Sequence, residues 1–571
     1  MNERLDLLTE QVDDIALLMA QLERMQVASV LDDHFQTHGN WKELSFGKTA
    51  VVWLTHILSA ADHRLNQVED WSGSRLHTLH HCVGERVEAR HFTDDRLAAL
   101  LRYLSVDADW DRFESHLNST LLRVYDLSAE VVRLDSTTMS GYYSVSEDGL
   151  FQFGHSKDRR PDLPQLKVML SSLDPLGLPL GIEVLSGERA DDRLYIPAIK
   201  RVRASIAGEG LLYIGDTKMA SMENRGFVAH GGDFYLCPLP KSQLSEAELN
   251  AYLLPVWEGE QALEAVFREN NSGESEKIAE GYEVIKEIES EVDGKPLSFQ
   301  ERHLVLRSEK LAEYGQEKLD DQLERVCKRL HAFNERKRGK KRHCLQELQQ
   351  KVNHILKRSQ VASLVEVEYQ DNTQKRVVKG YQGKAERIEE DIDVMISVQI
   401  NQTLYEQTVR ALGWRVYATN MPKARLPLAK ATLAYRDEYI IEGSFKRLKG
   451  RPLSIRPMHL QTDHHIIGLI RLLSIALKVL VLIEQQVRKQ LSQQQQSLSG
   501  LYAGNPKRST QTPTSTQLLG AFKQIYLTII FQQQQTIYHI TELNELQLRI
   551  LELLGFPDTI YTGIAQHLKP G

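Results

Sequence analysis

The sequence predicts an α/β protein whose strand-rich core is interrupted by a large insertion and flanked by helical regions. Three observations support this class. Apolar residues recur every three or four positions up to about residue 125, and short apolar runs separated by turns follow over 128–240. A long stretch, 217–441, then lies between two acidic residues, Asp216 and Glu442. That stretch is too long for a loop, so it must form a structure of its own.

Composition indicates an ordinary globular protein with more than one domain. The chain has 571 residues, of which 42% are hydrophobic and 26% charged. The first residues lack the apolar segment of a signal peptide. Cysteines are scattered without a Cys-x-x-Cys pair, which argues against a disulfide framework or zinc site and favours a reducing cytoplasm. The four are Cys82, Cys237, Cys327 and Cys344.

The longest apolar stretch, Ile466–Ile483, resembles a membrane span in length alone. Arg471 and Lys478 lie inside it. A charge within a bilayer costs several kcal/mol, so we expect a buried core helix instead.

Residues 1–125 are predicted to be helical. Apolar spacings of three and four occur over 13–22 and 50–58, and Thr93 is a candidate N-cap. No clear helix-turn-helix signature is present. The region would either recognise a partner directly or pack as a bundle on the core.

Residues 126–240 are predicted to form the first part of the core. The expected order is three strands, a helix (192–206), a fourth strand, a second helix (219–230) and a fifth strand. This order matches an RNase H-like domain, in which the first and fourth strands are neighbours. The fold would therefore bring Asp135, at the end of the first strand, beside Asp216, at the end of the fourth. The expected strands are 131–135, 166–174, 178–185, 211–216 and 233–239.

The remaining segments complete the predicted organisation. The insertion, 241–425, is expected to be charged and helical over 241–358 and strand-like over 361–420. Residues 426–490 would return to the core and carry Glu442 on a helix. Residues 491–571 are predicted to be a glutamine-rich linker followed by a helical C-terminal tail.

Asp135, Asp216 and Glu442 point to metal chemistry. Two carboxylates at strand ends and a third on a helix would hold two divalent metals about 4 Å apart, the arrangement used for in-line phosphoryl transfer. Oxygen ligands of this kind suit Mg²⁺ or Mn²⁺ rather than zinc.

Further motifs surround these acids. Ser156-Lys157-Asp158 begins a segment that continues through Arg160-Pro161-Asp162 to Gln165, and Gly215 to Lys218 surrounds the second acid. Tyr435, Glu442 and Lys449 follow the spacing Tyr, two residues, Arg, three residues, Glu, six residues, Lys. Together these motifs resemble the DDE transposases of bacterial insertion sequences. The position of the Arg is occupied by Glu438.

The resemblance implies metal-dependent DNA cleavage at element ends and strand transfer into target DNA. Asp135, Asp216 and Glu442 would bind two Mg²⁺ or Mn²⁺ ions, and Tyr435, Lys446 and Lys449 would contact phosphates. Double-stranded DNA, both terminal inverted repeats and target, would be the partner of a homodimer acting in the bacterial cytoplasm at the nucleoid. The N-terminal region would recognise the terminal repeats.

Glu438 departs from this pattern, because a carboxylate cannot contact a phosphate as Arg does. Steps of three and four would put 435, 438, 442, 446 and 449 on one helix face. Lys446 would then supply the missing charge, or Glu438 would raise the pKa of a neighbouring carboxylate in the absence of metal. Two other functions stay open: a catalytically silent DNA-binding protein derived from a transposase, and a nuclease that hydrolyses without joining strands.

Charge gives a mixed indication. The net charge of −7 argues mildly against a nucleic-acid binder. Basic runs at 336–343 and 446–451 argue the other way, and the second directly follows Glu442. We expect the second run to contact DNA, while the first is equally well explained as a solvated helix face.

Overall fold

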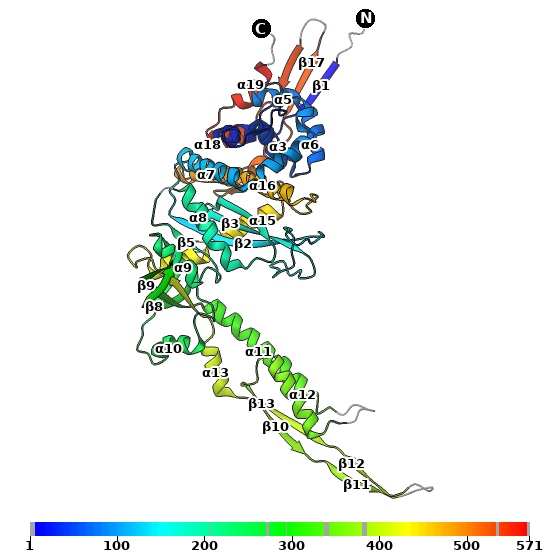
Figure 1. Ribbon diagram of the computed structural model, residues 1–571, viewed down its shortest axis with the longest axis vertical. Helices are drawn as coiled ribbons and strands as arrows, with labels where there is room; N and C mark the ends of the chain where they lie inside the picture. The colour runs from blue at the N-terminus through cyan, green and yellow to red at the C-terminus, as the bar shows by residue number, and fades with distance from the viewer. Residues whose placement is uncertain are drawn as a thin grey trace. The chain divides into compact units, whose positions relative to one another are not determined.

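The structure is a computed structural model that describes residues 6–206, 208–269, 273–292, 294–335, 342–379, 385–532 and 536–567. The chain forms two compact units. Unit 1 comprises Met1–Cys237, Ile288–Phe299 and Ala434–Gly571, and unit 2 comprises Pro238–Glu287 and Gln300–Leu433. Helices and a mixed sheet confirm the α/β class (Figure 1).

The sheet of unit 1 has the strand order β4-β3-β2-β5-β6. Its strands β2, β3 and β4 are antiparallel neighbours, whereas β5 runs parallel to both β2 and β6. All five correspond to predicted strands. They span Val131–Ser140 (β2), Gln165–Leu173 (β3), Leu178–Ser186 (β4), Leu212–Ile214 (β5) and Phe234–Pro238 (β6).

The strand β2 is longer than predicted. It pairs with β3 from Val132↔Leu173 to Ser140↔Gln165, so Asp135 lies in its middle and not at its end. The prediction that the strand ends at Asp135 was wrong because the residues that follow are polar, although they continue the strand to Ser140. In fact Ser136, Thr137 and Thr138 are all buried beside β3.

The two predicted core helices are present as α8 (Tyr195–Ser205) and α9 (Met222–His230). The apolar stretch forms α16 (Asp463–Gln493), which contacts both β4 and the N-terminal helix α6 (Asp94–Leu104). Figure 1 shows α16 between the N-terminal helices and the sheet. By length and apolar content α16 would cross a membrane, but 94% of its most apolar window is buried. The prediction of a core helix is confirmed.

Close approach of α16 to α6 depends on one glycine. A Cβ on Gly468 would lie 2.1 Å from the Leu101 carbonyl oxygen, which is far inside van der Waals contact. Any side chain at this position would push α16 away from α6 and open the core between them.

The N-terminal region is largely helical, as predicted, with one exception. The chain begins with β1 (Asp6–Gln11), which pairs with β17 (Tyr526–Phe531), and β17 pairs with β18 (Thr536–Ile540). The helices are α1 (Ile15–Arg24), α2 (Val27–His34), α3 (Phe46–Ala60), α4 (Val68–Gly73), α5 (Leu76–Val83), α6 and α7 (Asp107–Val124).

The C-terminal region is therefore not a purely helical tail, and this prediction was wrong. Along β17, Leu527 and Ile529 are buried while their neighbours are more exposed, the period-two pattern of a strand. The glutamine-rich residues up to Gln493 continue α16 rather than forming a linker. The helices that follow are α17 (Ser515–Gly520), α18 (Glu545–Leu554) and α19 (Thr559–His567).

Unit 2 combines strands with long helices. Residues 264–307, predicted to be helical, instead form β7 (Glu264–Glu269), β8 (Ser275–Val292) and β9 (Lys295–Arg307), the end of the β8–β9 hairpin belonging to unit 1. The strand β14 (Trp414–Thr419) pairs with β9. Charged residues alternate with apolar ones along β8, which is the pattern of a strand. The helix was predicted because the high charge content was given more weight than this alternation.

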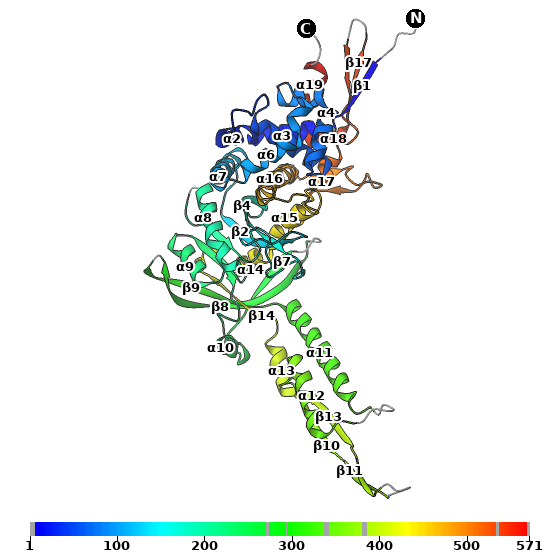
Figure 2. The same cartoon turned by 45° about the vertical axis from the view of Figure 1, so that its right-hand side comes forward.

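The helices of unit 2 are α10 (Glu246–Trp257), α11 (Glu309–His331), α12 (Leu345–Arg358) and α13 (Gln402–Arg410). Figure 2 shows α11 and α12, which pack against each other. The predicted strand-like part is confirmed by β10 (Val365–Asp371) paired with β13 (Val394–Ile400), and β11 (Gln374–Val378) paired with β12 (Arg387–Asp391).

Candidate active site

Asp135 lies on β2, and Asp216 follows the end of β5, its parallel neighbour. The last paired residues of β2 and β5 are Arg133 and Ile214, so each aspartate follows its strand's last pair by two residues. Adjacent strands are about 4.8 Å apart, which brings residues at the same level within side-chain reach. The two predicted acids are therefore side by side where the pairing of β2 with β5 ends, and we call this site, with the nearby Glu438, the acidic edge.

Each aspartate has one oxygen held by the protein. The Oδ1 of Asp135 accepts from the Ser136 backbone N–H (2.7 Å) and from Lys157 Nζ (3.2 Å). The Oδ1 of Asp216 accepts from the Tyr195 hydroxyl (2.7 Å) and from the Lys218 N–H (2.8 Å). Among the described residues, neither Oδ2 receives a hydrogen bond. Each carboxylate is thus fixed in direction with one oxygen left for a ligand.

The electrostatics of the pair reflect crowding of negative charge. Burial and the nearby Asp216 carboxylate raise the pKa of Asp135, although the Lys157 ammonium opposes them. Burial is also the main reason why the pKa of Tyr195 rises well above its usual value, and the two aspartates add to it. Tyr195 therefore remains a neutral hydrogen-bond donor to Asp216.

The helix expected over 435–449 is broken. One helix, α14 (Leu428–Arg436), ends before Asp437, and α15 (Tyr439–Lys449) begins after Glu438. Arg133 on β2 donates to the Ala434 carbonyl (2.7 Å), which a continuous helix would pair with the Glu438 N–H. The prediction of one continuous helix was therefore wrong: Tyr435 lies in α14, whereas Glu442, Lys446 and Lys449 lie in α15.

Glu438 lies within electrostatic range of both aspartates. The side chain is half-buried, and its pKa is raised by burial first, then by the charges of Asp135 and Glu442. This agrees with the expectation that Glu438 adds a carboxylate to the site. Glu442, the third predicted acid, lies one turn along α15 and is exposed. Glu438, at the position of the Arg, therefore interacts electrostatically with both Asp135 and Asp216.

A loop after β2 ties α15 to this edge. Lys157 bonds both Asp135 and the Ser136 carbonyl (2.6 Å), while the next residue, Asp158, accepts from Lys449 at the end of α15 (3.0 Å). Asp158 also pairs with Arg456. Burial lowers the pKa of Lys449, with Asp158 opposing the shift. The adjacent loop residues Lys157 and Asp158 thus hold Asp135 on β2 and Lys449 on α15.

The other predicted phosphate contacts differ in availability. Lys446 is exposed on α15, Tyr435 is half-buried, and Lys449 is engaged by Asp158. Within the second basic run, Arg447 pairs with Glu484 (2.8 Å). Most of the first run, residues 336–341, lies outside the described residues.

The candidate ligands are of the kind that a hard cation prefers, but they are not close enough together to bind one. Asp135, Asp216 and Glu438 offer carboxylate oxygens only, as Mg²⁺ and Mn²⁺ prefer. In the described part of the chain, no three His, Cys, Asp or Glu side chains converge closely enough to hold a metal ion. The two aspartates are in place, and a third ligand from α15 would have to approach them.

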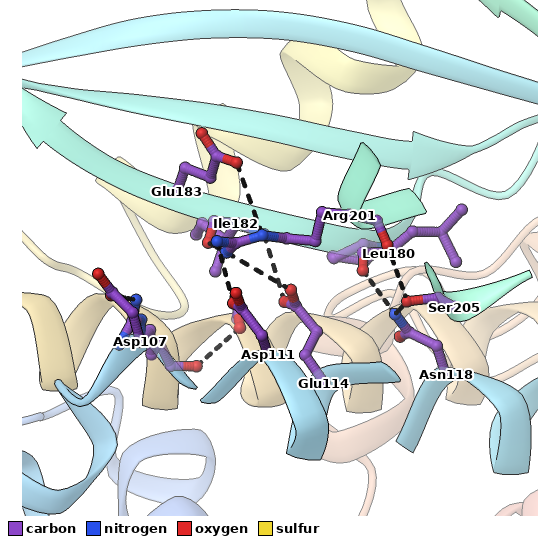
Figure 3. Close-up of polar contacts among 12 residues, drawn as sticks. Asp107, Asp111, Glu114, Asn118, Leu180, Ile182, Glu183, Arg201 and Ser205 are labelled. Carbon is purple, nitrogen blue, oxygen red and sulfur yellow. Dashed lines mark hydrogen bonds and ion pairs between the residues drawn. The ribbon is translucent and has the colours of Figure 1, made fainter. Parts of the chain in front are cut away.

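A second ionic cluster, not anticipated from the sequence, is buried between α7, α8, β4 and α16. Figure 3 shows Arg201 between Glu183 and Asp111, with Glu114 beside it. Lys478 of α16 donates to Asn118 (2.7 Å) and to the Pro179 carbonyl. Arg201 is shared by all three acids, of which Asp111 is exposed and Glu114 and Glu183 are buried. The cluster ties α7, α8 and β4 together, which is a structural role.

The chain matches no family model and no curated protein. Any assignment therefore depends on the motifs in the sequence and on the geometry of the acidic edge.

Proposed function

We propose that this protein is a DDE transposase that cleaves DNA at the ends of an insertion sequence and transfers the freed strand into target DNA. The observation that carries the proposal is the proximity of Asp135, on β2, to Asp216, just after the parallel strand β5, with α15 packed against β2. The strand order β4-β3-β2-β5-β6, with three antiparallel strands followed by two parallel ones, supports an RNase H-like core.

Two Mg²⁺ or Mn²⁺ ions would be held by Asp135, Asp216 and Glu442, with Glu438 as a competing or additional ligand. Such ions lower the pKa of a bound water and stabilise charge on the attacking and leaving oxygens of a phosphodiester. The free Oδ2 atoms of the aspartates support this role.

The protein's own groups would orient the acids and the DNA. Tyr195 and the Lys218 N–H hold Asp216, while Ser136 and Lys157 hold Asp135. When a metal cation binds the Asp135 carboxylate, it would displace the Lys157 ammonium. Lys157 could then bind a phosphate oxygen of the DNA. Lys446 is exposed and ready to bind a phosphate, whereas Lys449 would have to leave Asp158.

Partners and location follow from this activity. The DNA would be double-stranded, both the terminal inverted repeats and the target, and two copies of the chain would pair the two ends. Such a protein would act in the cytoplasm, at the nucleoid.

A catalytically silent DNA-binding protein is the second candidate. Glu438 favours it, because an extra carboxylate replaces a phosphate-binding Arg and adds negative charge where DNA would enter.

Cleavage of a supercoiled plasmid carrying the element ends, with Mg²⁺, tests the proposal. We expect the natural protein to cut, and Asp216→Ala and Glu442→Ala to lose at least about a thousandfold in rate. Arg123→Gln, an exposed change on α7, is the matched control and should cut normally. Equal cutting by all variants would contradict the metal site, and DNA binding without cutting would favour the silent binder. A labelled 3′-OH donor then separates a transposase, which joins strands, from a nuclease, which does not.

A further inference from the structure

Three hollows lie in unit 1: the first two share lining residues, and the third is lined by the residues on either side of Asp94, which lines the second. Hollow A (about 390 Å³) lies between the corner after α3 and the segment joining α15 to α16. Hollow B (about 480 Å³) shares His63, Arg64 and His459 with it and reaches Asp94. Hollow C (about 780 Å³) continues from Thr93 and Asp95 along α6 to Trp41.

Hollow A begins beside the candidate active site. Arg456, which lines it, donates to the Thr138 carbonyl of β2 (3.2 Å) and pairs with Asp158, the partner of Lys449. Thr138 is three residues along β2 from Asp135, or about 10 Å. A strand bound at the acids would therefore meet hollow A next.

Most charged groups lining the hollows are arginines, although the chain as a whole carries a net charge of −7. Arg451 and Arg102 are exposed, and no ion pair to either is found among the described residues. In hollow C, Arg96 stacks on Trp41 with its guanidinium 4.5 Å from the ring centre. The acidic groups are fewer: Asp62 is paired with Arg64 (2.7 Å), and Asp94 and Asp95 lie on α6.

We propose that hollows A, B and C form one continuous track that binds the sugar-phosphate backbone of duplex DNA leading away from the acidic edge. This inference rests on the proposed function for the identity of the ligand. Phosphates would lie along Arg456, Arg451, His459 and Arg64 and then along α6 to Arg102, so the N-terminal helices and the α15–α16 segment would grip one duplex together.

Binding of a fluorescent 40-base-pair duplex in EDTA, over a range of salt concentrations, tests the track without requiring cleavage. Arg451→Gln and Arg102→Gln should each weaken binding several-fold and reduce the slope of log K against log salt by about one. Both side chains are exposed, so folding should survive. Arg123→Gln, which lines none of the three hollows, should bind like the natural protein with an unchanged slope.

The outcomes separate this inference from the proposed activity. Weakened binding by both track variants supports the track even if no plasmid is ever cut. Natural-like affinity and slope in both variants would overturn it, even if cleavage is observed. Failure of the natural protein to bind duplex DNA would overturn it as well.

Discussion

Two groups of acidic residues in unit 1 differ in how their charges are met. In the buried cluster, Glu114 faces Arg201 and Lys478, and every acid has a cation within reach. At the acidic edge, burial and then neighbouring carboxylates raise the pKa of Asp135 and of Glu438, and Lys157 is ion-paired with Asp135 alone. The two groups therefore differ in how many cations are paired with their carboxylates, and carboxylates with few paired cations are the better candidates for binding a ligand.

The largest effect is expected in the buried cluster. Burial lowers the pKa of Lys478 and raises that of Glu114, and each charge partly offsets the other's shift. Lys478→Met should lower the free energy of unfolding at pH 7 by about 3 kcal/mol, because buried Glu114 then keeps only Arg201 (3.9 Å) as its ion-pair partner and Asn118 loses a donor. Chemical denaturation measures this. The double variant Lys478→Met, Glu114→Gln should recover part of the loss; an equal loss in single and double variants would mean that the two groups are not coupled.

At the acidic edge, replacing a charged residue is expected to stabilise the fold. The folded pKa of Asp135 is raised above its usual 3.8, so its charged form destabilises the fold. Asp135→Asn should stabilise the protein by about 1 kcal/mol at pH 7. Near pH 3 the difference should vanish, since the carboxyl is protonated in both states, and it should grow as the pH rises through the folded pKa. Thermal melting from pH 3 to 7 tests this, and a destabilised Asn variant would remove the contrast between the two regions.

A smaller effect should distinguish the two glutamates of the α15 region. Glu438 is half-buried near both aspartates and has a raised pKa, so Glu438→Gln should stabilise the fold by about 0.5 kcal/mol after allowance for solvent screening. The gain should appear above pH 4.5 and be lost at lower pH. Glu442→Gln, on an exposed position, should change stability by close to zero. A larger gain from Glu442→Gln would reverse the assignment of which glutamate faces the pair.

The sequence was sufficient to predict the pairing of Asp135 with Asp216, because apolar runs and turns define the order of the strands. It was insufficient for the α14–α15 break, which depends on Arg133 reaching a carbonyl 301 positions away in the chain. The buried cluster was missed for the same reason: Glu114 and Lys478 are ordinary charges until the fold brings α7 and α16 together. The strands β8 and β17 were missed because their alternating pattern was outweighed by charge or glutamine content.

The most direct test of the acidic edge is the effect of Mg²⁺ or Mn²⁺ on thermal unfolding without DNA. A cation that binds only the folded protein raises its melting temperature, by more at higher concentration. We expect the melting temperature of the natural protein to rise. Glu114→Gln should show the same rise relative to its own metal-free value, and the double variant Asp135→Asn, Asp216→Asn should show none. An equal rise in that double variant would contradict a metal site at these aspartates.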